Sequence, residues 1–100
     1  MEMKTKLTTE QIERLYNLGL DVINLDEMLS VLPKKITDRR KVYNIQIEIS
    51  DCLDEDEKWY ISYRNSLDID ELESFQSAEE LIDAIYNILV WLKTNKIQEL

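Results

Sequence analysis

The stretch from Ser77 to Thr94 constrains this chain most, because the helix that it predicts is apolar over most of its circumference. The large apolar residues recur at the three- and four-residue spacing of an α-helix. They are Leu81, Ile82, Ile85, Ile88, Leu89 and Leu92, and Ala84, Tyr86, Val90 and Trp91 widen the face. Ser77 and Glu80 have the spacing of a capping box at its start. A helix this apolar must be buried on several sides, so we expect it to lie across a sheet with further helices beside it.

Two shorter helices are predicted before it. Thr8 and Gln11 are spaced as a capping box, and Gly19 stands where a helix ends in a left-handed residue, which predicts a helix over residues 9–18. Its apolar face is expected to hold Ile12, Leu15 and Tyr16. The same pattern recurs at Asn24 and Glu27, and Pro33 stops the second helix, which is predicted over residues 25–31. Its apolar face is expected to hold Leu25, Met28, Leu29 and Leu32, with Ile23 packed on Met28 across the cap.

Two strands follow from strict alternation of apolar and polar residues. Residues 43–50 carry Tyr, Ile, Ile and Ile at every second position, and residues 59–64 alternate in the same way from Trp59. The short link over residues 51–58 favours an antiparallel hairpin. A third strand is expected near residues 71–75, because a lone hairpin is only marginally stable.

These elements predict one α+β domain over residues 1–100. It has two short N-terminal helices, a small antiparallel sheet of two or three strands, and a long C-terminal helix packed across the sheet. One glycine and one proline leave little material for long loops or for an all-β fold with many tight turns. The longest apolar run is the five residues from Ile88 to Leu92, whereas a membrane span needs about 20. The N-terminus has no apolar run behind its charges, so no signal peptide and a cytoplasmic location are expected.

The side-chain inventory argues against catalysis. The chain has no histidine, and Cys52 is its only cysteine, which excludes Cys/His zinc sites and Cys-His nucleophile pairs within one chain. A single glycine excludes a P-loop and a Rossmann fingerprint. The carboxylates from Asp54 do not match an EF-hand loop, because Trp59 falls where that loop needs glycine. We therefore expect no catalytic residue, metal or cofactor, and keep a carboxylate-only or metal-dependent enzyme as the last hypothesis.

The charges are unevenly placed along the chain. Residues 1–50 carry eight basic and eight acidic side chains, whereas residues 51–100 carry four and thirteen, and the net charge is −9. The positively charged candidates for docking a partner are Lys34, Lys35, Arg39 and Arg40. The negatively charged candidates are Asp54, Glu55, Asp56 and Glu57. Solvated charge that keeps the protein soluble is the alternative interpretation of both groups. An acidic chain with a pI of about 4.4 is a poor direct binder of nucleic acid, since such binders are typically basic.

Three aromatic residues are candidates for partner contacts. Tyr60 is predicted on the sheet face that no helix is left to cover, and Tyr86 and Trp91 fall at the margin of the buried side of the last helix. Exposed aromatic side chains are typical of protein interfaces, whereas core packing is the alternative. A homodimer through the open sheet face or the last helix is one arrangement that would cover them.

The order of segments resembles small uncharacterised proteins encoded on phages and mobile elements of gut bacteria. The resemblance rests on Leu7-Thr8-Thr9-Glu10-Gln11 with Leu18-Gly19, on Met28-Leu29 with Leu32-Pro33, on Trp59 to Tyr63, and on Glu80 to Tyr86 with Val90-Trp91-Leu92. It implies a mobile-element context and assigns no activity or site. A looser similarity is to antitoxins built as a small sheet followed by one helix.

The leading hypothesis is a non-catalytic accessory protein that binds another protein. The alternative is an acidic nucleic-acid mimic or antitoxin-like inhibitor, because twelve carboxylates fall between Asp51 and Asp83 against Lys58 and Arg64 alone. Such a mimic should bind a basic cleft with an affinity that falls steeply as salt is added.

Overall fold

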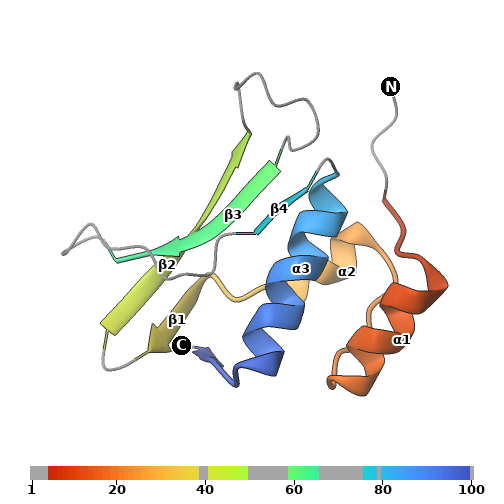
Figure 1. The fold of residues 1–100 in the computed structure, drawn as a ribbon, viewed down its shortest axis with the longest axis horizontal. Helices are drawn as coiled ribbons and strands as arrows, with labels where there is room; N and C mark the ends of the chain where they lie inside the picture. Colours follow the sequence, from red (N-terminus) through yellow and green to blue (C-terminus); the bar gives the residue numbers. More distant parts are fainter. Residues whose placement is uncertain (1–4, 39–40, 50–58, 66–75, 79, 100) are drawn as a thin grey trace.

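The computed structural model describes residues 5–38, 41–49, 59–65, 76–78 and 80–99 (Figure 1). Three helices and five strands lie within these ranges. In chain order they are α1 (Thr9–Asn17), α2 (Leu25–Val31), β1 (Lys35–Asp38), β2 (Lys41–Ile49), β3 (Trp59–Arg64), β4 (Gln76–Ala78), α3 (Leu81–Thr94) and β5 (Gln98–Glu99). The α+β class is confirmed, and so is the packing of the C-terminal helix on an antiparallel sheet.

The sheet is larger than the two or three strands that the sequence predicted. Its described strands run in the order β4-β3-β2-β1-β5, and every neighbouring pair is antiparallel. The basic stretch after α2, where the sequence predicted no strand, contains β1. Alternation did not reveal this strand because Ile36 is its only large apolar residue, and four residues are too few for a period of two to stand out. The third strand expected near residues 71–75 lies outside the described residues.

The start of the last helix also differs from the prediction. Ser77 does not cap the helix, because it lies in β4 and is paired with Tyr60 of β3. The helix begins at Leu81, and its cap residue, Glu80, forms no capping hydrogen bond with its side chain. The local capping pattern was outcompeted by strand pairing, which brings residues 76–78 into the ladder with β3.

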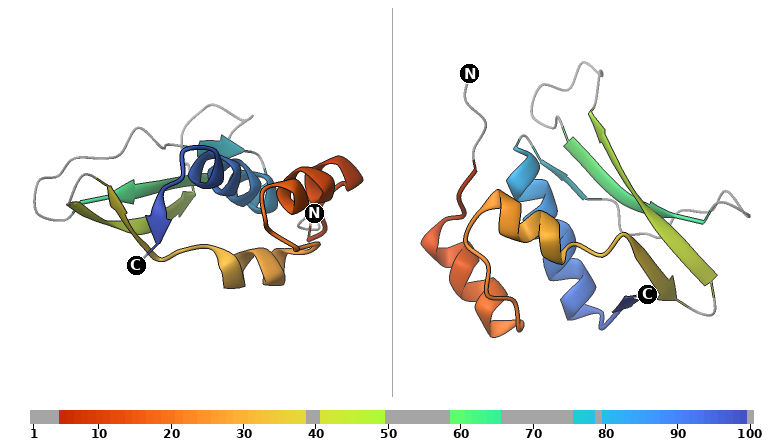
Figure 2. Two further views of the ribbon diagram at one scale, coloured as in Figure 1. Left: turned by 90° about the horizontal axis from the view of Figure 1, so that it is seen from below. Right: turned by 180° about the vertical axis from the view of Figure 1, so that it is seen from behind.

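Helix α3 lies between the sheet and the two N-terminal helices (Figures 1 and 2). It contacts β3 and β4 on one side and α1 and α2 on the other. Its buried residues are Ile82, Ala84, Ile85, Ile88, Leu89 and Leu92. Burial of each large aliphatic side chain contributes about 1.5–3 kcal/mol, so this helix is the centre of the hydrophobic core, as its broad apolar surface predicted.

Helix α1 is closed at both ends by local hydrogen bonds. The Thr8 hydroxyl accepts from the Gln11 N–H at 3.2 Å, and the Gln11 side-chain oxygen accepts from the Thr8 N–H at 3.0 Å. At the other end the Leu20 N–H donates to the Leu15 carbonyl and the Gly19 N–H to the Tyr16 carbonyl. This is a Schellman motif, and Gly19 supplies its left-handed residue with a φ of +93°.

Helix α3 ends in the same motif without a glycine. The Ile97 N–H donates to the Leu92 carbonyl at 3.0 Å, and the Lys96 N–H donates to the Lys93 carbonyl at 3.3 Å. Lys96 therefore adopts a φ of 54°, which costs a residue with a Cβ about 1 kcal/mol. The reversal directs the chain into β5, which pairs with β1 at the edge of the sheet.

Aromatic and β-branched residues pack on the face of the sheet that meets α3, where Ile47 near the end of β2 stays 41% exposed. Ile36, Tyr43, Ile61 and Tyr63 are all buried there. The Tyr63 hydroxyl donates to the Pro33 carbonyl at 2.7 Å, which ties the centre of β3 to the link between α2 and β1. This bond therefore helps to hold the sheet against the helical layer that α1 and α2 form.

Candidate interaction site

The aromatic residues proposed from sequence are less exposed than a free interaction surface requires. Tyr86 and Trp91 are half-buried and pack against the core. Tyr60 is also half-buried, and its neighbour Ser62, which the alternation of the strand places on the same face, is only 4% exposed. The sequence predicted that no helix covers this face of the sheet. In the structure the face is shielded over the centre of β3 and exposed along β2, at Val42, Gln46 and Glu48.

The charged candidates divide into described and undescribed residues. Six of the candidates lie outside the described residues: Asp54, Glu55, Asp56, Glu57, Arg39 and Arg40. The hypothesis of an acidic nucleic-acid mimic therefore rests on the sequence alone. Lys34 and Lys35 are exposed at the start of β1. This pair of lysines therefore lies on the surface of the protein, where β1 begins.

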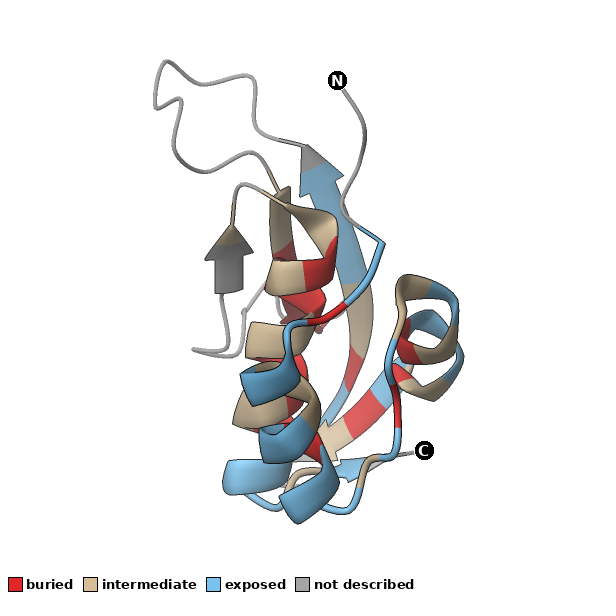
Figure 3. Cartoon of the chain, turned by 90° about the vertical axis from the view of Figure 1, so that its right-hand side faces the viewer, coloured by how far each residue is buried: buried red, intermediate tan, exposed pale blue. Residues whose placement is uncertain are grey.

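Periodicity assigned Ile47 of β2 and three apolar residues of the helical layer to packed positions, and all four are exposed instead, Ile47 by 41%. Tyr16 of α1 is 66% exposed, Ile23 before α2 is 51% exposed, and Leu29 of α2 is 41% exposed. Figure 3 shows that α1 and α2 present much exposed surface on their outer sides. The reason is geometric: each of these short helices fully buries one residue, Leu15 in α1 and Met28 in α2. A contact this narrow leaves the flanks of the apolar stripe in solvent.

The helical layer that carries these side chains is held in place by specific bonds. The chain before α1 forms a two-residue bridge with the chain before α2, in which the Leu7 N–H donates to the Ile23 carbonyl at 3.1 Å. The reciprocal bond runs from the Leu25 N–H to the Thr5 carbonyl at 2.8 Å. The Gln11 side-chain amide donates to the Asp83 carboxylate at 2.9 Å and so fastens α1 to α3. Tyr16, Ile23 and Leu29 therefore project from a fixed support.

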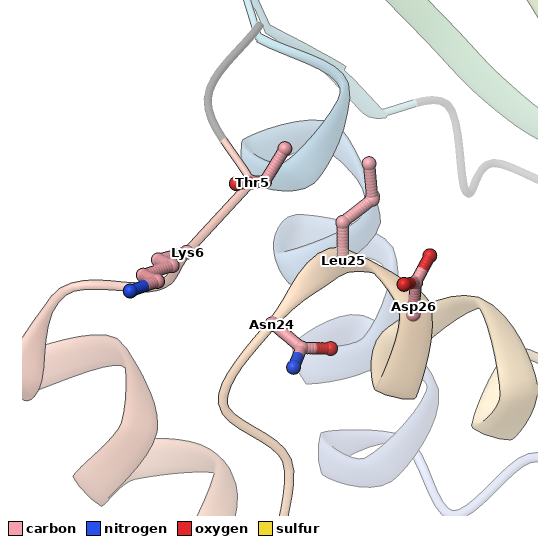
Figure 4. A pocket seen from close by; sticks show the side chains of 5 residues that line it. All are labelled: Thr5, Lys6, Asn24, Leu25 and Asp26. Atoms are coloured by element: carbon pink, nitrogen blue, oxygen red, sulfur yellow. The ribbon is translucent and has the colours of Figure 1, made fainter.

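A shallow hollow of about 220 Å³ lies beside the same bridge (Figure 4). It is lined by Thr5, Lys6, Asn24, Leu25 and Asp26. The Asn24 side-chain oxygen is already used, because it accepts from the Glu27 N–H at 2.9 Å to cap α2. Ligand pockets usually measure about 300–1,000 Å³ and are mostly apolar. This hollow is smaller, partly open and lined by polar and apolar atoms in similar measure, so it does not have the character of a substrate pocket.

Within the described ranges, no three His, Cys, Asp or Glu side chains gather as metal ligands would. No helix among these residues combines the length and the apolarity that a bilayer crossing requires. Comparisons with protein-family models, with curated proteins and with solved structures found no match to this chain. The candidate site is therefore defined by its surface alone, as the three exposed apolar side chains of α1, α2 and the segment between them.

Proposed function

We propose that this protein acts without catalysis, as an accessory protein that binds another protein. The observation that carries the proposal is the exposure of Tyr16, Ile23 and Leu29 on the helical layer. We name these three residues the apolar triplet. Tyrosine is enriched among residues that dominate binding energy, because it buries a large area with few rotatable bonds.

The energetics of the triplet support a contact of useful strength. Complete burial of a large apolar side chain contributes about 1.5–3 kcal/mol. Roughly half of each triplet side chain is exposed and remains to be buried, so a partner gains on the order of 1 kcal/mol at each position. This is enough for three positions together to decide specificity, although a complete interface also needs surrounding contacts that exclude water.

The support of the triplet reduces the entropic cost of binding. The bridge between Lys6 and Asn24, the capping box of α1 and the bond from Gln11 to Asp83 hold the backbone in its bound form before the partner arrives. A preorganised surface loses less conformational freedom on association. The resemblance to small proteins of mobile elements is compatible with such an accessory role and adds no partner of its own.

A photo-crosslinking residue placed at single positions of the otherwise intact protein tests this proposal. We expect benzoylphenylalanine at position 16 or 29 to yield one discrete adduct in cells that produce the protein. The same residue in place of Gln46 or Glu48, which are also exposed and both lie on β2, is the matched control. Equal adducts from all four positions, or none from 16 and 29, would contradict the proposal.

The mass of the adduct separates a foreign partner from a second copy of the chain. An adduct at twice the chain mass of 11.9 kDa identifies a homodimer through the triplet. A different mass identifies a partner protein, whose affinity is then measured with purified components. We expect Tyr16→Ala to weaken that affinity about fivefold to tenfold. The circular dichroism spectrum and the melting temperature should stay unchanged, because the side chain is mostly in solvent.

A further inference from the structure

The fold gathers lysines from distant parts of the sequence at one edge of the sheet. Strand β5 pairs with β1 so that Thr37 faces Gln98 and Ile36 faces Glu99. In this register the residues just before β5 come level with the end of β1, where Asp38 is paired with Lys41. The turn that follows α3 therefore leads into a strand that borders β1, and β5 lies beside β1 in the lower part of Figure 1.

This arrangement concentrates positive charge in an acidic protein. Five of the eight described basic side chains lie at this edge, together with two of the ten described acidic residues. We name the five lysines the basic edge; they are Lys34, Lys35, Lys41, Lys93 and Lys96. The other described parts of the chain are net acidic. The fold therefore turns an uneven charge distribution along the sequence into a charged region in space.

The lysines flank the edge from both faces of the sheet. Ile36 is buried toward α3, so its neighbour Lys35 points to the opposite face. Lys93 and Lys96 come from α3 and from the turn that follows it, on the side of the helices. Lys34, Lys35, Lys93 and Lys96 are all exposed. These four side chains are available to a partner that lies along the edge.

We infer that the basic edge is a second docking surface and that its partner is a carboxylate-rich segment of a protein. Complementary charge steers such partners together and fixes their orientation. Nucleic acid fits less well, because a duplex carries a charge every 1.7 Å along its whole length and would extend from the edge across the rest of a chain of net charge −9. A short acidic protein segment matches a cationic region of limited extent. This inference goes beyond the proposed function, since it involves neither the apolar triplet nor its partner.

Fluorescence anisotropy of a labelled peptide of about twelve glutamates, at low ionic strength, tests the edge directly. The edge variant combines Lys35→Glu with Lys93→Glu. The control variant combines Lys6→Glu with Arg14→Glu, two exposed cations away from the edge, and changes the net charge by the same amount. We expect about tenfold weaker binding for the edge variant and less than a twofold change for the control. If circular dichroism shows that the edge variant is unfolded, Lys34→Gln with Lys35→Gln replaces it.

Three outcomes overturn the inference. The first is absence of peptide binding by the unchanged protein, and the second is an equal loss in the edge and control variants. The third is that a single-stranded oligonucleotide of the same length binds through the same lysines more tightly than the peptide does. In that case phosphates, and not carboxylates, would be the anions of the partner.

A photo-crosslinker in place of Gln98, which is exposed within β5, then identifies the partner segment by mass spectrometry. We expect an acidic cross-linked peptide, and a neutral or basic one contradicts the inference. Because these probes are separate from those at positions 16 and 29, failure of either proposal leaves the other standing.

Discussion

Removal of one hydroxyl group, in Tyr63→Phe, should measurably loosen the joint between the sheet and the helical layer. The side chain is fully buried, and its hydroxyl donates to the Pro33 carbonyl at 2.7 Å. Loss of a neutral hydrogen bond costs about 0.5–1.5 kcal/mol, and a partly buried carbonyl left without its donor adds to this loss. We expect the free energy of unfolding to fall by about 1–2 kcal/mol. For a domain of this size, each kcal/mol lowers the melting temperature by about 4–8 °C.

Equilibrium unfolding in urea, followed by circular dichroism, measures this difference. Tyr43→Phe is the matched control, because Tyr43 is buried on the same face of the sheet and the structure gives its hydroxyl no partner among the described residues. We expect the control to change the free energy of unfolding by less than about 0.5 kcal/mol. Equal effects of the two substitutions would refute the role of the Pro33 carbonyl and would assign the cost to the loss of a hydroxyl from either site.

Two further predictions concern the left-handed residues that end α1 and α3. Gly19→Ala should destabilise the protein by about 1–2 kcal/mol, although a Cβ there meets nothing within 4 Å, because the cost is conformational and arises from the φ of +93°. Lys96→Gly should raise the melting temperature by relieving a φ of 54°, with a gain of about 0.5–1 kcal/mol. Thermal unfolding of the two variants measures both, and a shift of the same sign in each would contradict the argument from backbone strain.

The elements with strong local signals were predictable from sequence. Thr8, Gln11 and Gly19 mark the two ends of α1, and the structure has the expected bonds at both. The alternation from Tyr43 to Ile49 predicted the longest strand, because each successive residue faces the opposite side of the sheet. These patterns depend on residues within a few positions of one another, so one sequence is enough to show them.

The candidate sites were predicted less well, since exposure depends on what covers a side chain. Tyr60, Tyr86 and Trp91 were expected at the surface and are half-buried. Tyr16 and Leu29 have the spacing of core residues and are exposed, because α1 and α2 bury only narrow stripes of their surface. A weak signal existed in the length of α2, whose seven residues cannot bury apolar positions on more than one side.

The sequence alone determined the α+β class, the positions of α1, α2, β2 and β3, and the central place of the apolar helix, because helix and strand periods are local properties of the chain. Only the tertiary structure decided that β1, β4 and β5 complete the sheet, that Ser77 pairs with a strand instead of capping a helix, and that the strand following Lys93 and Lys96 pairs with β1. The physical reason is that strand pairing and side-chain burial join residues tens of positions apart. Their free energy depends on how the whole chain packs and leaves little trace in any short stretch of sequence.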